Sequence, residues 1–283
     1  MTLRATVLIP AHDEASVIAR TLRPLRAAAE AGVLKLVVIA NGCADATAKV
    51  ATSACPGAVV LETAIPGKTQ ALNLGFGTEA VAGLPVLCLD ADLEVSEAGL
   101  LALVRAVEQG ALAAVGRMTV DATKASPLVR AYQRAWALNP YFAKGKFGGV
   151  FALAHPVARQ VFPLPAVTGD DEFLRRSLDP ARVAFVPECQ FVAQSPRTLS
   201  SLHATRKRAL RGARQVQRLG LANPTPSSAT QMLRAGLAAP RRLGDLAVFF
   251  AVVGMTRLSL ALEPKGKPQI WERDLTTREG RAQ

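Results

Sequence analysis

Two aspartates with a single residue between them follow an apolar run in this chain. Asp90 and Asp92 flank Ala91 within the segment GLPVLCLDADLEVS, residues 83–96. Two carboxylates this close repel each other, but Mn²⁺ and Mg²⁺ favour such oxygen ligands and commonly bind substrate phosphates as well. In an extended segment Ala91 would point into the core, away from both carboxylates. The pair predicts a divalent-metal site for a phosphorylated ligand; a strand that merely ends at a polar turn is the alternative.

A second group of acids lies in TGDDEF, residues 168–173. A carboxylate such as Asp171 can act as a general base, removing the proton of a hydroxyl group while its oxygen attacks. The alternative is a helix start, with Thr168 or Asp170 as the N-cap and acids in the first turn. These residues alone leave both interpretations open.

Strand-like and helix-like segments alternate through the first half of the chain. Apolar runs rich in β-branched residues predict strands, and segments with apolar residues at helical spacing follow each of them. Four such units predict a mainly parallel sheet with helices on both faces. The predicted strands cover residues 5–11, 34–40, 57–63 and 85–90, and the predicted helices cover residues 15–32, 45–55, 68–83 and 96–110.

Polar segments follow three of the predicted strands. They are residues 10–14 (PAHDE), 40–45 (ANGCAD) and 90–92 (DAD). In open α/β sheets ligands bind outside the carboxyl ends of the strands, so this edge is the predicted site.

Two common nucleotide-binding loops do not fit the sequence. The first predicted strand is followed by IPAHDEAS, which lacks the G-x-G-x-x-G pattern of a dinucleotide site. The segment 66–70 contains the triplet GKT, but Glu62 stands where a phosphate-binding loop needs its first glycine. A nucleotide-binding sheet that uses a metal for its phosphate site is the remaining expectation.

Composition and charge limit the class of protein to which the chain can belong. The chain has 283 residues, half of them hydrophobic, which is enough for a substantial core. Its four cysteines form no C-x-x-C pair and no apolar leader opens the chain, so we expect a cytoplasmic protein without structural zinc. The formal net charge is +12, and no acidic residue occurs between Arg197 and Arg242. That basic segment should attract phosphate, whether of a nucleotide, a nucleic acid or an anionic membrane.

Six segments in order resemble the motifs of glycosyltransferase family 2, whose members have the GT-A fold. The resemblance covers roughly residues 4–215 and includes the family's metal-binding D-x-D and its G-E-D-x-x-L helix start. It implies a nucleotide-diphospho-sugar transferase. In chain order the segments are residues 7–22, 37–51, 66–76, 87–92, 146–156 and 168–178.

The resemblance also implies roles for individual residues. In the metal site, Asp90 and Asp92 would hold Mn²⁺ or Mg²⁺, with His203 as a third ligand or, alternatively, a surface histidine. Asp171, with Asp170 beside it, would be the catalytic base. The residues that would bind the nucleotide sugar are Pro10, Ala11, Asp13, Glu14, Asn41, Asp45, Lys68, Asn73, Asp90, Ala91, Arg208 and Arg211.

The C-terminal part lies outside the resemblance. We expect a catalytic domain over residues 1–215 and a helical extension over residues 216–283. Its apolar run, Leu246 to Thr256, is too short to span a bilayer of about 30 Å. The run could be a helix buried against the catalytic domain or an interfacial helix on an anionic leaflet.

The expected protein is a cytoplasmic, metal-dependent glycosyltransferase that moves one sugar from a nucleotide-diphosphate donor to an acceptor hydroxyl with inversion. The acceptor would be a glycan of the cell envelope, a lipid-linked sugar or a small molecule, with peripheral membrane contact and no nucleic acid. Three alternatives stay open: a retaining GT-A enzyme, a nucleotidyltransferase, and a non-catalytic adaptor for nucleic acid or membrane.

Overall fold

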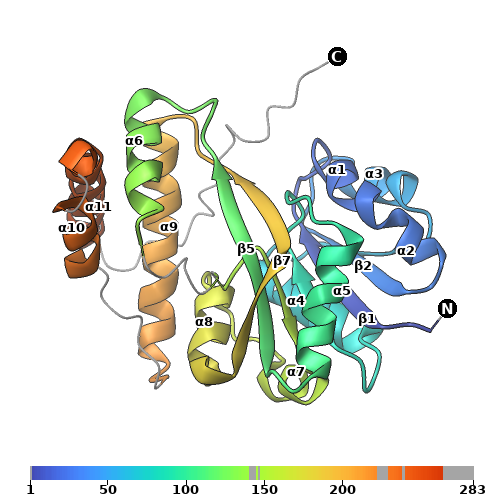
Figure 1. Cartoon of the computed structure of the whole chain (residues 1–283). Coiled ribbons are helices and arrows are strands. Elements are labelled where there is room, and N and C mark those ends of the chain that lie inside the picture. Colours follow the sequence, from blue (N-terminus) through green and yellow to red (C-terminus); the bar gives the residue numbers. More distant parts are fainter. Residues whose placement is uncertain (1, 140–144, 146, 222–228, 238–239, 264–283) are drawn as a thin grey trace.

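A single seven-stranded sheet forms the centre of the protein (Figure 1). The computed structural model describes residues 2–139, 145, 147–221, 229–237 and 240–263. The strand order is β3-β2-β1-β4-β6-β5-β7. The strands are β1 (Ala5–Ala11), β2 (Leu34–Asn41), β3 (Val59–Thr63), β4 (Val86–Leu89), β5 (Ala113–Asp121), β6 (Val150–Leu153) and β7 (Val183–Gln194).

The sheet is mainly parallel, as predicted. β1 pairs in parallel with β2 and β4, β2 with β3, and β5 with β7. β6 is the exception, because it runs antiparallel to both β4 and β5. The short β6 lies between β4 and β5 and so joins the first four strands to the two long strands β5 and β7.

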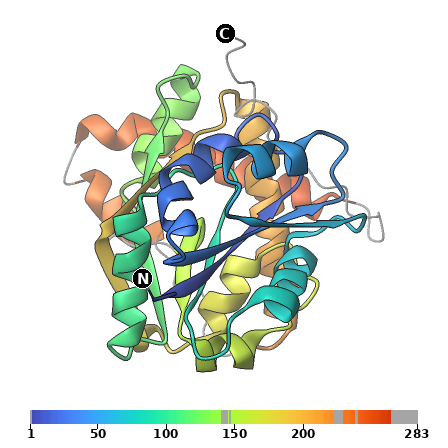
Figure 2. The same cartoon turned by 90° about the vertical axis from the view of Figure 1, so that its right-hand side faces the viewer.

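Helices cover both faces of the sheet (Figure 2). The α-helices are α1 (Ile18–Leu22), α2 (Arg26–Glu30), α3 (Thr47–Ala54), α4 (Lys68–Glu79), α5 (Glu97–Glu108), α6 (Pro127–Trp136), α7 (His155–Val161), α8 (Asp170–Ser177), α9 (Leu199–Arg218), α10 (Ala229–Leu237) and α11 (Leu243–Ala261). Short 3-10 turns cover Arg23–Leu25, Pro180–Arg182 and Pro240–Arg242.

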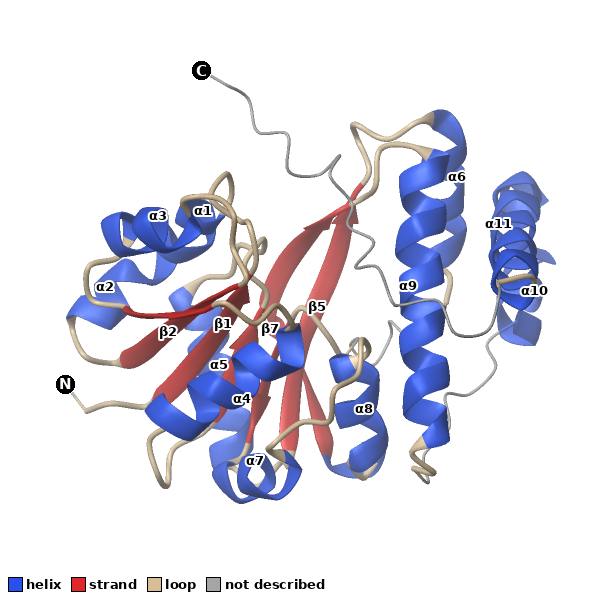
Figure 3. Ribbon diagram, turned by 180° about the vertical axis from the view of Figure 1, so that it is seen from behind, coloured by secondary structure: helices blue, strands red, loops and turns tan. Residues whose placement is uncertain are grey.

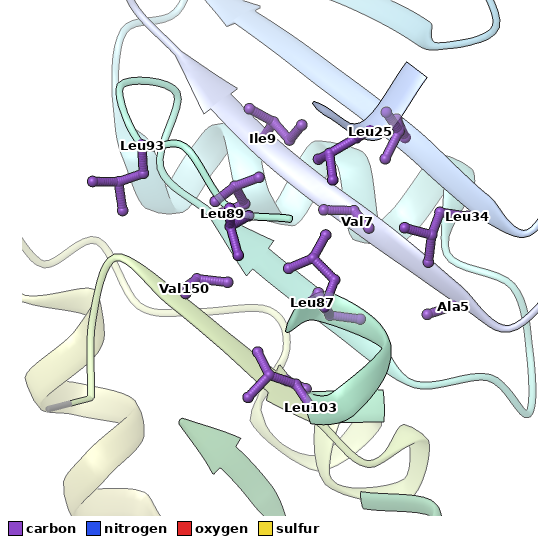
Figure 4. Close-up of a cluster of buried hydrophobic side chains, with 14 of the residues drawn as sticks. Ala5, Val7, Ile9, Leu25, Leu34, Leu87, Leu89, Leu93, Leu103 and Val150 are labelled. Atoms are coloured by element: carbon purple, nitrogen blue, oxygen red, sulfur yellow. The ribbon is translucent and has the colours of Figure 1, made fainter. Parts of the chain in front are cut away.

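Alternation along the strands builds the two layers of the core. Val7 and Ile9 of β1 face α1, α2 and α5 together with Leu87 and Leu89 of β4, as the labelled side chains of Figure 4 show. Leu8, between Val7 and Ile9, belongs to the opposite cluster with residues of α4, α7 and α8. Successive side chains of a strand point to opposite faces, so strands that are apolar throughout need cover on both sides.

The first predicted helix is broken in the middle. Residues 15–32 were expected to form one helix, but the chain forms α1, a 3-10 turn over Arg23–Leu25, and α2. Pro24 lies in that turn; proline lacks the N–H that a continuous helix requires and clashes with the preceding turn.

The C-terminal helices share a third core with α6. Leu246, Phe249 and Val252 of α11 pack with Tyr132 of α6 and Leu202 of α9. The rings of Tyr132 and Phe249 stack with their centroids 5.0 Å apart. The predicted domain boundary at residue 215 lies within α9, and α11 packs along α6 and α9 (Figure 3).

Candidate active site

Lys68 joins two carboxylates from distant parts of the chain. Its Nζ lies 2.8 Å from Asp90 Oδ1 and 2.9 Å from Asp170 Oδ2. Asp90 directly follows β4, whereas Lys68 and Asp170 are the first residues of α4 and α8. The carboxyl end of β4 and the N-termini of two helices therefore meet at one charged cluster.

Burial makes this cluster electrostatically strong. Burial alone would lower the pKa of Lys68, but the carboxylates of Asp170, Asp90 and Asp171 outweigh it and raise that pKa well above the usual value. Burial is also the main reason that the pKa of Asp170 is raised, although the ammonium of Lys68 opposes the increase. Lys68 is therefore charged at neutral pH, and it compensates the buried acid.

The aspartate turn after β4 is fixed from both sides. Asp90 N donates to Gly149 O at 2.8 Å, and Thr21 Oγ1 donates to Ala91 O at 2.7 Å. Arg20 also donates to the backbone carbonyl of Asp92, at 3.2 Å. Ala91 is only 4% exposed and belongs to the core, as its position between two outward carboxylates predicts. The turn is thus preorganised by α1 and by the segment before β6.

The three residues predicted to hold the cation are not gathered into a complete site. Among the described residues, Asp90, Asp92 and His203 do not form a set whose ligand atoms lie within 4.8 Å of one another. His203 Nε2 is buried and has no hydrogen-bond partner there, so the ring nitrogen is available as a ligand. The donor set of two carboxylates and an imidazole suits Mn²⁺ chemically, and the phosphates of a donor would have to complete it.

Another cluster of ligand-type atoms lies at the ends of β1 and β2, where His12, Asp13 and Cys43 come within 4.8 Å of one another. Their contacts with the backbone account for this arrangement. His12 Nδ1 lies 2.6 Å from Asn41 O, and Cys43 Sγ accepts from Asp13 N at 3.4 Å. Asp13 Oδ1 accepts from Ala44 N at 2.6 Å. These contacts join the loops that follow β1 and β2.

Asn41 links three segments of the predicted nucleoside pocket. It is buried, its amide donates to Ala11 O at 2.8 Å, and its carbonyl accepts from Gly67 N at 2.9 Å. The ends of β1 and β2 are thereby tied to the residue before Lys68. Both polar groups of this side chain bond to the backbone here, and its binding of the nucleotide sugar stays a prediction.

Hydrogen bonds also join the loops after β1 and β2. Asp13 has a positive φ of 49°, a conformation that aspartate tolerates better than most residues. Asp45 accepts from Ala15 N at 3.0 Å, and Glu14 N donates to Thr47 Oγ1 at 2.7 Å. Pro10 and Ala11 are the last residues of β1, directly before this loop. The loops after β1 and β2 therefore interlock as one rigid unit.

Asn73 has a structural contact that the sequence did not indicate. Its amide donates to Leu164 O at 2.9 Å and its carbonyl accepts from Leu164 N at 2.6 Å. This two-point contact ties α4 to the segment that leads to α8. The contact thereby fixes the positions of Lys68 and Asp170, the first residues of those helices, relative to each other.

The start of α8 is not capped by a side chain. Its N-cap is Gly169, and neither Thr168 nor Asp170 makes the capping hydrogen bond considered as an alternative. Asp170 is buried and lies against Lys68, whereas Asp171 is half-buried and accepts from Glu172 N at 2.8 Å. Asp171 is thus the more accessible carboxylate of the two.

Two close backbone approaches position these acids. A Cβ at Gly148 would lie 2.9 Å from Asp171 Oδ2, and φ at Gly148 is +133°. A Cβ at Gly212 in α9 would lie 2.8 Å from the backbone nitrogen of Gly169. Glycine at these two positions allows the loop before β6 to come this near to Asp171, and α9 to come this near to the residue that precedes α8.

The basic residues of α9 are directed partly toward the C-terminal segment. Arg211 and Lys207 both form ion pairs with Glu263, and these two partners lower the pKa of Glu263 to about 2. Arg211 would have to leave Glu263 to reach a diphosphate. For Arg208, binding of the nucleotide sugar stays a prediction.

Solved structures with the same arrangement define the class of fold. The chain is similar to glucosyl-3-phosphoglycerate synthase from Mycobacterium tuberculosis in complex with Mn²⁺ and UDP-glucose, with a TM-score of 0.56 and 20% identity over 78% of this chain and 80% of that one. Two further structures of that synthase, with phosphoglyceric acid or glycerol 3-phosphate also bound, give TM-scores of 0.54 and 0.53 at 20% identity, covering 78% of this chain and 81% and 82% of theirs. The fold is therefore the GT-A fold of nucleotide-sugar transferases.

The sequence assigns the chain to a family within that class. A family model described as glycosyl transferase family 2 matches residues 6–156, and the chain belongs to this family. It is accordingly a glycosyltransferase, as the motif resemblance implied. Among curated proteins, sequence comparison finds no match.

Proposed function

We propose that the protein transfers one sugar from a UDP-sugar to an acceptor hydroxyl in a reaction that needs Mn²⁺. The observation that carries the proposal is the Lys68 ammonium between Asp90 and Asp170 at the carboxyl end of β4. A basic group among acids at this edge suits a diphosphate accompanied by a divalent cation. The UDP-glucose and Mn²⁺ of the similar synthase support the choice of donor and metal.

In this proposal Lys68 binds the donor through its phosphates. Its charge is maintained by the surrounding carboxylates, so it can neutralise phosphate oxygens without losing its proton. Asp170 is the positioning residue that holds the ammonium at the start of α4. Asp92, Asp90 and His203 would hold the cation, which when bound stabilises the charge of the departing diphosphate.

Asp171 is the proposed base for an inverting transfer. It lies next to Asp170, at the first turn of α8, and is the less buried of the two acids. It would accept the proton of the acceptor hydroxyl while that oxygen bonds to the anomeric carbon. The neighbouring Gly148 leaves its Oδ2 unobstructed by a side chain on that residue.

A retaining transfer to a small acidic acceptor is the second candidate. It would use the same metal ligands, the buried ring nitrogen of His203 included, and would need no base at Asp171. The similar synthase has phosphoglyceric acid bound as well as UDP-glucose. NMR of the anomeric proton of the product distinguishes the two candidates directly.

Donor hydrolysis tests the proposal without knowledge of the acceptor. The wild-type protein with Mn²⁺ should release UDP from UDP-glucose or a related UDP-sugar faster than it releases the nucleotide from GDP- or dTDP-sugars. The Lys68→Met variant should lose this release, whereas Lys124→Met, which changes a lysine after β5, should retain it. Equal release by the Lys68→Met variant would contradict the proposed donor site.

A further inference from the structure

The outer surface of α11 is apolar where a helix of a water-soluble protein normally carries polar residues. The inner face of the helix packs on α6 and α9 through Leu246, Phe249 and Val252. In Figures 1 and 3, α10 and α11 form the outermost layer at the end of the molecule farthest from α1 and α3. The α11 outer face is defined by its exposed apolar residues, Leu243, Ala247, Phe250, Ala251, Gly254, Met255, Leu258, Ala261 and Leu262.

This face is large and nearly free of charge. Met255, Leu258 and Leu262 are 47%, 60% and 75% exposed. Within the described helix, Arg257 is the one charged residue that accompanies them at the surface. Contiguous exposed apolar surface of this kind marks contact with a partner or a membrane.

The charges around the face are positive. Arg234 of α10 and Arg241 before α11 are exposed, as is Arg257. Between residues 229 and 262 the sole acid in the sequence is Asp245, which is turned inward to Arg134 at 2.6 Å and Arg242 at 3.2 Å. Glu263, which directly follows Leu262, is paired with Arg211 and Lys207. Among the described residues of this segment the apolar face thus has basic flanks and no unpaired outward carboxylate, which complements a surface that is apolar within and anionic at its boundary.

We infer that the α11 outer face docks on an anionic lipid surface. Its leucine, methionine and phenylalanine side chains would enter the acyl boundary while the flanking arginines contact lipid phosphates. This inference goes beyond the proposed transfer and does not depend on the donor. It assigns the surface at which the protein meets a membrane.

Two other arrangements of the helix fit the structure less well. The apolar run Leu246 to Thr256 was expected to be too short to span a bilayer, but the helix that contains it, α11, is long and apolar enough to do so by length and composition alone. Spanning would pull the inner face of α11, including the Arg134–Asp245 ion pair, out of the core shared with α6. A second copy of the protein would bring another set of arginines to the face. It would supply no outward carboxylate from α11 to pair with them.

Flotation with vesicles tests the inference on the full chain. The protein should float with vesicles of phosphatidylcholine and phosphatidylglycerol, bind vesicles of phosphatidylcholine alone much less, and lose part of its binding at high salt. The variant with Met255→Glu and Leu258→Glu should bind about tenfold or more weakly, because each change removes an apolar side chain from the acyl boundary. Val192→Glu, an equally exposed position on β7, should bind like the wild type.

Folding and assembly are measured on the same samples. Thermal unfolding should show that the double variant is as stable as the wild type, since both positions are exposed. Failure of the wild type to float, or equal binding by the double variant, would overturn the inference. The inference would also be overturned if the wild type formed a dimer without binding vesicles and the two substitutions abolished that dimer. The face would then contact a second copy of the protein. Donor hydrolysis by the double variant is expected to be unchanged in solution, which separates this test from that of the proposed function.

Discussion

Lys68 Nζ lies 2.9 Å from Asp170 Oδ2, although one residue begins α4 and the other begins α8. Asp170 is 4% exposed, so its negative charge is compensated by the ammonium group of Lys68 rather than by water. A buried charge that loses its partner is strongly destabilising. In the proposed function, the ion pair therefore couples the stability of the site to its capacity to bind a phosphorylated donor.

Replacing Lys68 with methionine should destabilise the protein in a pH-dependent manner. Burial raises the pKa of Asp170 in the folded state, so folding favours its protonated form. Without the lysine that preference grows, and the loss of stability should be small in acid and increase as the pH rises through the folded-state pKa of Asp170. At neutral pH the cost should be about 3 kcal/mol, measured by urea unfolding.

The double variant with Lys68→Met and Asp170→Asn provides the control. It removes both charges and should recover most of the lost stability at neutral pH while still failing to bind donor. A double variant as unstable as Lys68→Met would show that the ion pair is not the cause.

Asp171 and Asp170 should differ in the step that they affect. Asp171→Asn should lower kcat about 10²- to 10⁴-fold with little change in donor affinity, because a general base acts on the acceptor. Asp170→Asn should instead weaken donor binding through Lys68. Steady-state kinetics with donor titrations distinguishes the two, and a retained kcat in Asp171→Asn would favour the retaining alternative.

Gly212 should be essential for the position of α8. A methyl group there would lie 2.8 Å from Gly169 N, so Gly212→Ala should push α9 from α8 and cost about 1–3 kcal/mol. Gly254→Ala, in α11 with nothing within 4 Å of the added carbon, is the matched control and should be neutral or slightly stabilising. Thermal unfolding of both variants checks this, and equal stability would contradict the role given to the contact.

Glu263 should contribute stability only above acidic pH. Hydrogen bonds from Arg211 and Lys207 lower its pKa from 4.5 to about 2, so the folded state favours the charged form. The wild type should exceed Glu263→Gln by about 1 kcal/mol at neutral pH, a modest value because the side chain is partly exposed. The difference should vanish as the pH falls through the two pKa values. Urea unfolding across that range tests it, and a constant difference would exclude this ion pair as the source.

Local patterns predicted the strands β1 to β4 and the edge of the sheet where the candidate site lies, whereas β5, β6 and β7 were not among the predicted strands. Residues 5–11 are apolar almost throughout, as the burial of β1 on both faces requires. The inward position of Ala91 follows from the alternation of side chains along an extended segment. The break of the first helix could also have been predicted, since Pro24 stands in the middle of the segment.

Contacts across the sequence were not predictable in the same way. The partners of Asn73, Arg211 and Lys68 come from residues far along the chain, and no local spacing signals them. The close approach of Gly212 to Gly169 depends on how α9 crosses α8. Antiparallel β6 likewise depends on a pairing that apolar composition alone does not specify.

In the proposed function, the carboxylates after β4 bind a divalent ion together with a nucleotide diphosphate. Calorimetric titration of UDP in the presence and absence of Mn²⁺ tests it most directly, on the wild type and on Asp92→Asn. We expect the wild type to bind UDP at least about tenfold more strongly with Mn²⁺ than without it. The Asp92→Asn variant should bind UDP equally weakly with or without the ion. Metal-dependent binding of the same strength in Asp92→Asn would contradict it.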